Sequence, residues 1–409
     1  MRLPARQTLT SKIPAEPDWI KERRSAAAKI FGGAPRPSFK YGLGISFDPA
    51  AIHLPFSSSA AARPGAKPAV GGGQGTVLTW AEALARPATA ARMKEYLRDQ
   101  PPSEDKIWSW HEANCAGGLV IHLGRGLRLK EPIRLEYAQT EPVRLDRLLI
   151  IAEPGSSAAV TEHLGSVVGA ASWRGLDVGI LAKNDSRVDY VAVQNLASGH
   201  TAFARKRALC GSRAAVSWIE CAFGGDLISD DAAVELRGSG ASAALHNLFF
   251  GSAAQRFDLN QRAIHLAPAT DSKLFSRGAL DDRARAVCRG LIRMERGSNG
   301  CQGRQKADTL LLKDSAGIST IPALEINEAD VSCGHASATG RLDPEDLFYL
   351  MSRGLDEAAA VRQLLYGFFA PTVREMRDHG LEDMVTCLIG HRLGAVPDEE
   401  LKDRLCAKK

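Results

Sequence analysis

The chain lacks the features that mark membrane and secreted proteins. Its 409 residues contain no run approaching the ~18 apolar residues of a membrane-spanning helix. The N-terminus has basic residues but no apolar stretch of the length that a secretory signal needs. The eight cysteines are scattered and include no CxxC pair, which favours free thiols over a disulfide framework. We therefore expect a cytoplasmic location and no association with a membrane.

Sequence motifs for common types of catalysis are also absent. There is no GxxxxGK[ST] loop, so we expect this chain to bind no ATP itself. Neither an HExxH zinc motif nor a GxSxG nucleophile elbow occurs. The pairs Glu162–His163 and Asp281–Asp282 fall where turns or strand edges are expected. A structural role is therefore predicted for both pairs.

The charge pattern gives no sign of a nucleic-acid partner. The formal net charge is only +5, and no concentrated basic patch accompanies it. Arg205, Lys206 and Arg207 form a run of just three basic residues. We expect this short run to be a solvated segment.

A series of short apolar runs fills the region from about residue 108 to 338. Runs such as Leu148–Ala152 alternate with small turn residues, and no long helical periodicity lies between them. Turn serines recur about every 26 to 30 residues, at Ser156, Ser186, Ser212 and Ser239. A stacked β-solenoid, or β-helix, explains both the repeat and the missing helices. A β-sandwich is the alternative, because strand spacing by itself does not exclude it.

Helical patterns lie on both sides of this β-rich region. In the N-terminal part, residues 17–31 and 80–98 have apolar residues at helical spacing, and a Gly/Pro/Ser-rich stretch at 32–75 predicts an irregular loop. We therefore predict three domains, at residues 1–107, 108–338 and 339–409. The first and third are helical, and the middle one is the β core.

The third region opens with clear helix signals. Asp343 can cap a first helix, Pro344 suits its first turn and Gly354 suits its end. Asp356 can cap a second helix, which Pro371 should end or kink. The second helix carries an apolar stripe at Val361, Leu364, Leu365, Phe368 and Phe369. From the pattern alone, this stripe suits core packing and a partner surface about equally.

Cys333 and His335 are the best candidates for metal ligands. In a strand, residues two apart point to the same face, so a thiolate and an imidazole would project together. Thiolate suits iron–sulfur clusters and zinc, and imidazole suits iron or zinc. A stable site usually needs three or four ligands, so a second chain would have to complete it. A buried cysteine beside a hydrogen-bonded histidine is the simpler reading, as is strand packing for His265, Cys288 and Cys301.

Several segments together resemble the SufB/SufD family of the SUF iron–sulfur cluster assembly system. The resemblance covers nearly the whole chain except the 32–75 loop, and it is closest at Gly340–Gly354, GRLDPEDLFYLMSRG. The other matching segments are Glu16–Phe31, His111–Gly126 with Pro132–Leu135, Asp271–Arg293 and Tyr366–Phe369.

The resemblance implies a right-handed parallel β-helix flanked by N-terminal and C-terminal helical domains. It implies a non-catalytic scaffold that pairs with a SufB-like subunit as a heterodimer and docks a SufC-like ABC ATPase. A cysteine desulfurase is a further candidate partner. The implied cargo is a transient iron–sulfur cluster at the subunit interface, and the use of a flavin stays open.

The motifs resemble the D-type subunit more than the B-type. B-type chains carry a cysteine and a glutamate at the positions of Ala307 and Ala336, whereas D-type chains share the C-x-H motif found at Cys333 and His335. The resemblance implies that His335 and Cys333 bind the cluster or its iron together with the partner. The residues implied to bind partners are Leu347, Phe348, Tyr349, Leu350, Arg353, Gly354, Tyr366, Phe368 and Phe369.

Two other functions are compatible with parts of this pattern. One is a SufB-like or homodimeric scaffold of the same system. The other, from a different class, is a stand-alone β-solenoid enzyme acting on acidic polysaccharide, although no secretory signal or row of carboxylates supports it.

Overall fold

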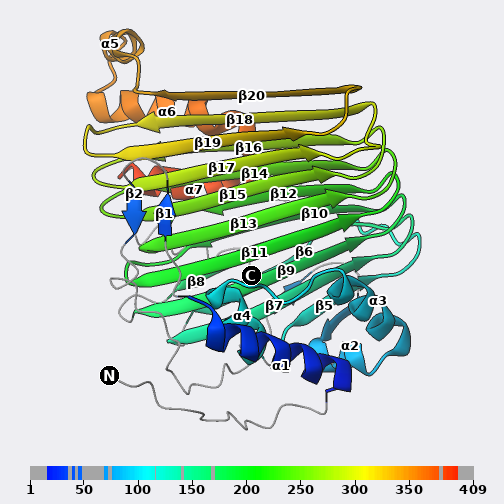
Figure 1. Cartoon of the computed structure of the whole chain (residues 1–409). Coiled ribbons are helices and arrows are strands. Elements are labelled where there is room, and N and C mark those ends of the chain that lie inside the picture. The colour runs from blue at the N-terminus through cyan, green and yellow to red at the C-terminus, as the bar shows by residue number, and fades with distance from the viewer. Residues whose placement is uncertain are drawn as a thin grey trace.

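The core of the protein is a parallel β-solenoid built from two facing sheets (Figure 1). The computed structural model describes residues 16–35, 39–41, 45–47, 69–71, 76–115, 117–139, 142–166, 171–376 and 381–394. Consecutive strands alternate between the two sheets, and neighbours within a sheet are parallel from β5 and β6 onwards. This topology confirms the predicted parallel β-helix and rules out the sandwich alternative.

We call the two nine-stranded sheets the odd sheet and the even sheet, after the numbering of their strands. The odd sheet contains β4 (Thr76–Thr79), β5 (Leu119–Leu123), β7 (Val143–Ala152), β9 (Ser172–Ala182), β11 (His200–Cys210), β13 (Leu227–Leu236), β15 (Arg256–His265), β17 (Arg285–Met294) and β19 (Gly317–Ile326). The even sheet contains β3 (Ala69–Gly71), β6 (Ile133–Gln139), β8 (Ser157–Ser166), β10 (Arg187–Asn195), β12 (Ala215–Ala222), β14 (Ser242–Gly251), β16 (Asp271–Leu280), β18 (Cys301–Leu311) and β20 (Val331–Gly340).

One coil of the solenoid takes a little under thirty residues in its middle part. Arg187 pairs with Ala215, Ala215 with Ser242 and Ser242 with Asp271, so successive coils are 27 to 29 residues apart. A corner residue with positive φ precedes most even strands, and its N–H donates to the next coil, as Asp185 does to the Ser212 carbonyl at 2.9 Å. Each corner is thereby hydrogen-bonded to the one stacked on it.

The serine repeat seen in the sequence is only partly in register with these corners. Ser156 and Ser186 follow the positive-φ residue, and each hydroxyl donates to a carbonyl three residues earlier. Ser212 and Ser239 instead precede that residue and accept bonds through their own carbonyls. Serine therefore occupies two different positions of equivalent turns. The predicted repeat length is confirmed, although the four serines are not structurally equivalent.

The interior of the solenoid is mostly aliphatic. Ile150, Val178, Val234 and Leu245 are among its fully buried residues, and they come from both sheets. Because strand side chains alternate in direction, the other half of each strand faces outward. Those outer faces need covering wherever they are apolar, and the helices supply the cover.

Four N-terminal helices cover the odd sheet over the first coils (Figure 1). They are α1 (Asp18–Gly33), α2 (Trp80–Leu84), α3 (Pro87–Arg98) and α4 (Lys106–Asn114). The helix predicted at 17–31 is confirmed as α1. The single helix predicted at 80–98 is wrong, because Arg86 is extended and Pro87 starts a new helix. Helix α4 runs across the domain boundary that the sequence placed after residue 107.

The predicted irregular loop at 32–75 is wrong for part of its length. Two of its segments form the antiparallel pair β1 (Phe39–Tyr41) and β2 (Ile45–Phe47). A third segment is β3, which pairs antiparallel with β6 at the start of the even sheet, just as β4 pairs with β5. These strands are three or four residues long, too short for a pattern to show.

The C-terminal helices are α5 (Pro344–Ser352), α6 (Glu357–Arg374) and α7 (Glu382–Arg392). The predicted signals are confirmed: Asp343 accepts from the Glu345 N–H at 2.8 Å, and Gly354 has φ +97° just after α5. Pro371 does not end α6, which continues to Arg374. The neighbouring Thr372 and Val373 are buried, so packing holds the last turn despite the proline.

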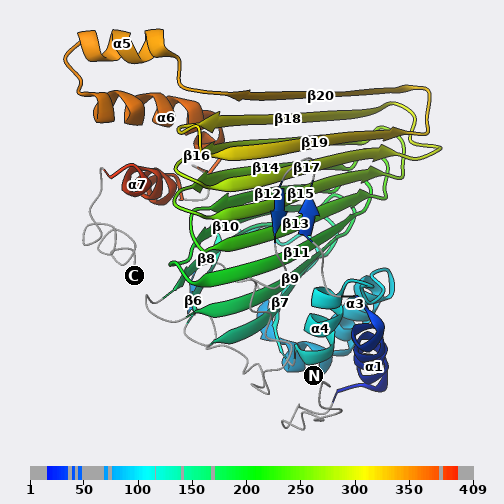
Figure 2. The same cartoon turned by 60° about the vertical axis from the view of Figure 1, so that its left-hand side comes forward.

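Helices α6 and α7 pack on the outer face of the even sheet. Leu365, Phe369 and Leu388 join Ile219 and Phe250 in one buried cluster there. Helix α5 has no buried residue, and Figure 2 shows it raised away from α6 beside the end of the solenoid where β20 runs. The N-terminal helices lie at the opposite end.

Candidate functional site

The last coil of the solenoid, β19 with β20, is open at one side. Within the described part of the chain, β20 pairs with β18 alone and β19 with β17 alone. Apolar side chains reach the surface on β19, where Ile321 is 37% exposed and Ile326 41% exposed. An unpaired strand edge offers free backbone donors and acceptors to another chain. This end therefore has the properties of a surface that a partner completes.

Cys333 and His335 lie on β20, in this open coil. Their register partners on β18 are Gly303 and Gln305. Cys333 is half-buried against the apolar interior, and the strand alternation places His335 on the same inner face. The predicted strand is confirmed, and it brings the thiol and the imidazole to the mouth of the solenoid.

The two side chains differ in how ready they are to bind a metal. His335 is exposed, whereas burial raises the pKa of the Cys333 thiol above its usual value. A Cβ at Gly303 would lie 3.2 Å from the Cys333 Sγ, so the glycine makes room for that thiol. Because a metal needs the thiolate, Cys333 must lose a proton from an environment that favours the neutral form. The imidazole is thus the more available donor in the free chain.

No complete metal site is found among the described residues. No group of three or more His, Cys, Asp or Glu side chains there is arranged to hold a metal ion. The cysteines outside the terminal coil are buried in the described ranges: Cys115, Cys210, Cys221, Cys288, Cys301 and Cys387. Cys406 lies outside the described residues. Cys333 and His335 would therefore need ligands from outside the described residues.

The other candidate residues have structural surroundings. His265 is fully buried between hydroxyls, with Nδ1 2.7 Å from Thr270 Oγ1 and Nε2 2.8 Å from Ser272 Oγ. Burial lowers the pKa of His265 to about 4, so the ring is neutral. Cys301 contacts the same threonine, with 2.9 Å between Sγ and Oγ1. The packing role predicted for these residues is confirmed.

The two polar pairs also have structural partners. Glu162 accepts from Arg174 at 3.1 Å and from the Tyr190 hydroxyl, all in the solenoid interior. Asp282 occupies a corner with φ +49° and accepts from the Ala253 N–H at 2.8 Å. Both pairs thus stabilise the coils, as the sequence predicted.

The prediction that residues 205–207 are solvated is wrong. Lys206 points into the solenoid and is only 2% exposed. Arg205 points outward and makes two hydrogen bonds to Asp177, at 3.0 and 3.1 Å, under the N-terminal helices. Arg207 is paired with Asp231 on the neighbouring strand. The sequence did contain a signal for these ion pairs. The acidic pair Asp230–Asp231 follows about one coil later, and it pairs with Lys206 and Arg207 in the structure.

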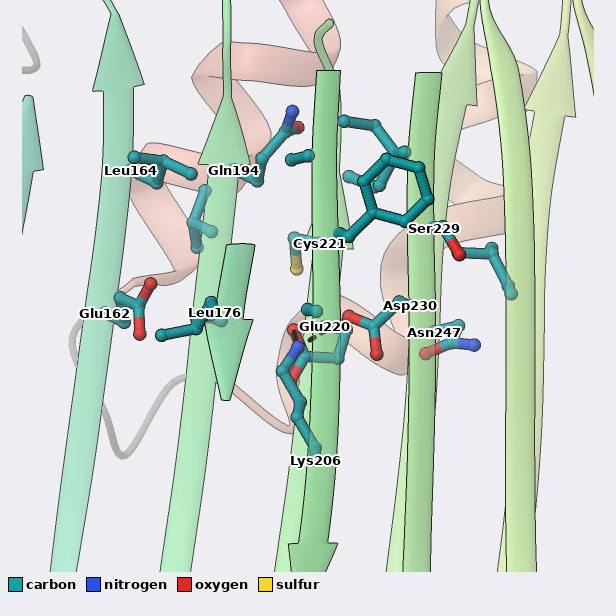
Figure 3. A pocket seen from close by; sticks show the side chains of 18 of the residues that line it. Glu162, Leu164, Leu176, Gln194, Lys206, Glu220, Cys221, Ser229, Asp230 and Asn247 are labelled. Atoms are coloured by element: carbon teal, nitrogen blue, oxygen red, sulfur yellow. Dashed lines mark hydrogen bonds and ion pairs between the residues drawn. The ribbon is translucent and has the colours of Figure 1, made fainter. Parts of the chain in front are cut away.

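Lys206 is the centre of a buried ionic cluster that Figure 3 shows from close by. Its ammonium donates to Asp230 Oδ2 at 2.5 Å and also contacts Glu220. Burial raises the pKa of both carboxyl groups, and Oε1 of Glu220 has no hydrogen-bond partner among the described residues. A cavity of about 50 Å³, also lined by Asn247, adjoins the cluster and has room for a water molecule.

The predicted partner-binding residues fall into two groups. On α5, Phe348 is 73% and Tyr349 56% exposed, with the Arg353 guanidinium 5.2 Å from the Tyr349 ring centre. Leu347 and Leu350 on the same helix are half-buried, and the exposed Gly354 ends it.

The second group lies on α6, where Tyr366 and Phe368 are half-buried and pack at the edge of the cluster with α7. Phe369 is fully buried in that cluster, so this ring anchors the helix and is not available to a partner.

An exposed apolar surface on α5 extends beyond the predicted residues. Met351 on α5 is 42% exposed, and Leu355, three residues beyond the end of the helix, is 38% exposed; neither was expected from the sequence. We call Phe348, Tyr349, Met351 and Leu355 the α5 patch. Large exposed apolar side chains on and just after a helix with no buried residue are typical of interaction surfaces.

Comparison with known proteins identifies the family. Residues 136–368 match the model of the SUF system FeS cluster assembly SufBD core domain. The chain belongs to the SufBD family. The matched region takes in part of β6, strands β7 to β20, α5 and most of α6. It therefore includes the open coil with Cys333 and His335.

Individual SufBD proteins are similar to this chain at modest identity. The iron–sulfur cluster assembly protein SufD of Bacillus subtilis is 28% identical over 328 residues, which are 78% of this chain and 74% of that protein. SufB of the same organism is 28% identical over 279 residues, 68% of this chain and 60% of that protein. A SufBD family protein of Staphylococcus saprophyticus is 28% identical over 287 residues, 69% of this chain and 62% of that protein. The match thus spans less than two thirds of the latter two relatives.

None of the helices in the described ranges is both long and apolar enough to cross a membrane.

Proposed function

We propose that this SufBD chain is a D-type scaffold subunit for iron–sulfur cluster assembly. In this proposal it pairs with a B-type subunit through the open coil, and His335, assisted by Cys333, binds iron or a nascent cluster at the junction. The observation that carries the proposal is the unpaired last coil with these two side chains at its mouth. A site with two ligands from one chain becomes complete only when a second chain adds its own.

Residues at the junction support the D-type assignment. Ala307 is a buried residue of β18. B-type chains carry a cysteine at this position. Ala336 follows His335 where B-type chains carry a glutamate. Neither alanine can bind a metal, so this chain would bring fewer ligands than its partner and depend on it for the rest.

The α5 patch supports docking of a C-type ATPase. The chain has no phosphate-binding loop of its own, so any ATP-driven step must come from another subunit. Phe348 and Tyr349 supply the exposed aromatic anchors that protein interfaces favour. The patch adjoins the open coil in sequence, since β20 ends at Gly340 and α5 starts at Pro344. A motion of a docked ATPase would therefore act close to the cargo.

Co-purification tests this function directly. The tagged full chain is expressed together with B-type and C-type subunits and passed through affinity and size-exclusion columns. We expect one complex containing all three, and labile iron and sulfide that fall when His335 is changed to Gln while the complex stays assembled. No association with either partner would overturn the proposal.

A homodimeric scaffold is the second candidate, because the same open edge could pair with its own copy. Light scattering of the purified chain distinguishes the two cases. A stable dimer that persists when the B-type subunit is added would favour the homodimer, whereas replacement by a heterodimer would favour the D-type role.

A further inference from the structure

Gln305 carries an unmet hydrogen-bond acceptor next to the candidate ligand His335. The residue is only 8% exposed, and its Oε1 has no hydrogen-bond partner among the residues that the structure describes. Leaving a buried polar atom unpaired costs free energy, so such atoms are rare in folded proteins and call for an explanation.

The space around this amide is made by a glycine. Gly290 on β17 lies across the interior, and a Cβ there would be 2.0 Å from the Gln305 Nε2. The glycine therefore admits the Gln305 side chain into the mouth of the solenoid. Since no described residue donates a hydrogen bond to Oε1, this atom can still accept one.

His335 is the register partner of Gln305 on the adjacent strand. Neighbouring strands are about 4.8 Å apart, and both residues point to the inner face. The imidazole and the amide are therefore side by side, and the ring carries the N–H donor that Oε1 lacks. Rotation of the exposed His335 ring is the movement that would bring donor and acceptor together.

We propose that Gln305 is a positioning residue for His335. Its Oε1 accepts the N–H of one ring nitrogen, and the other nitrogen is thereby deprotonated and directed at the iron. This inference rests on the ligand role proposed for His335. Histidines that bind metals almost always donate their second N–H to an acceptor, which selects the tautomer and fixes the ring.

The test compares variants in the assembled complex with the B-type subunit. Gln305→Leu keeps the volume but removes the acceptor, and Gln305→Glu restores an acceptor. Gln302→Leu is the matched control, because Gln302 lies on the same strand but is exposed on the outer face. Ferrous iron binding is measured under anaerobic conditions against a competing chelator, and size exclusion checks that each complex is intact.

We expect Gln305→Leu to weaken iron binding about tenfold or more, Gln305→Glu to restore most of it and Gln302→Leu to leave it unchanged. Pulsed EPR of the reduced cluster should show an altered coupling to the imidazole nitrogen in Gln305→Leu.

Two outcomes would overturn the inference and are distinguishable. If His335→Gln abolishes iron binding but Gln305→Leu binds iron like wild type, the positioning role is wrong while the ligand role stands. If Gln305→Glu fails to restore iron binding, the positioning role is likewise wrong. If His335→Gln itself binds like wild type, the ligand role fails, and the inference fails with it.

Discussion

Replacing Lys206 by Met removes the only cation that contacts Glu220 and Asp230 in the described structure. Methionine fills a similar volume, so the change is mainly electrostatic. Breaking a buried ion pair by removing one partner typically costs about 3–5 kcal/mol, because the remaining charge has no compensation. We expect a loss of that size in the free energy of unfolding at neutral pH.

The pH dependence gives a second, independent check. Without the ammonium, the folded protein must keep one more carboxyl group protonated, whereas the unfolded chain releases that proton above the ordinary glutamate pKa of 4.5. The raised carboxyl pKa means that the folded state binds the extra proton, so stability falls as pH rises, by about 1.4 kcal/mol per pH unit. The loss should therefore be larger at about pH 7.5 than at about pH 5.5.

Urea unfolding followed by circular dichroism measures the loss at both pH values. Lys306→Met is the matched control, because Lys306 on β18 is half-exposed and its bond to Asp308 is a surface ion pair of 2.9 Å. The control should lose no more than about 1 kcal/mol at either pH. A loss for Lys206→Met that matches the control, or that grows as the pH falls, would refute the reasoning.

Three further predictions concern the C-terminal helices. Phe369→Ala should lower the free energy of unfolding by about 3–5 kcal/mol in the same assay, because its ring is fully buried; a loss below about 1 kcal/mol would contradict this packing. Phe348→Asp should abolish ATPase retention in a pull-down without changing the melting temperature, because Phe348 is 73% exposed, and undiminished retention would exclude the α5 patch. Asp343→Ala should destabilise the capped end of α5 by about 1 kcal/mol and increase amide hydrogen exchange there, whereas unchanged exchange would show that the cap is dispensable.

The solenoid was predictable because its determinants are local and repeated. Each coil contains a similar turn and a similar apolar run. Apolar runs such as Val188–Val193 therefore predicted the strands, and the turn spacing predicted that the coils stack. The caps of α5 were equally local, since Asp343 bonds to an N–H two residues away. A local pattern is less informative where a distant contact overrides it: Pro371 was expected to end or kink α6, yet the helix continues to Arg374.

The candidate site was only half visible in the sequence. Spacing placed Cys333 and His335 on one face of a strand, but it did not show that this strand is the unpaired end of the even sheet. Gln305 was missed because nothing near it in the chain marks it. Its neighbours Gly290 and His335 are 15 and 30 residues away in sequence and meet it only through the coil register.

The sequence by itself determined the repeat, the helical regions at both ends of the chain and the two candidate ligands Cys333 and His335. Each of these features depends on residues within one turn, one helix or one strand. Tertiary structure alone decided where charges lie. Lys206 is buried and Arg205 lies beneath the N-terminal helices because their carboxylate partners come from neighbouring strands, 24 to 28 residues away. The free energy of a charge depends on its burial and its partners, and in a solenoid both are set by the adjacent coil.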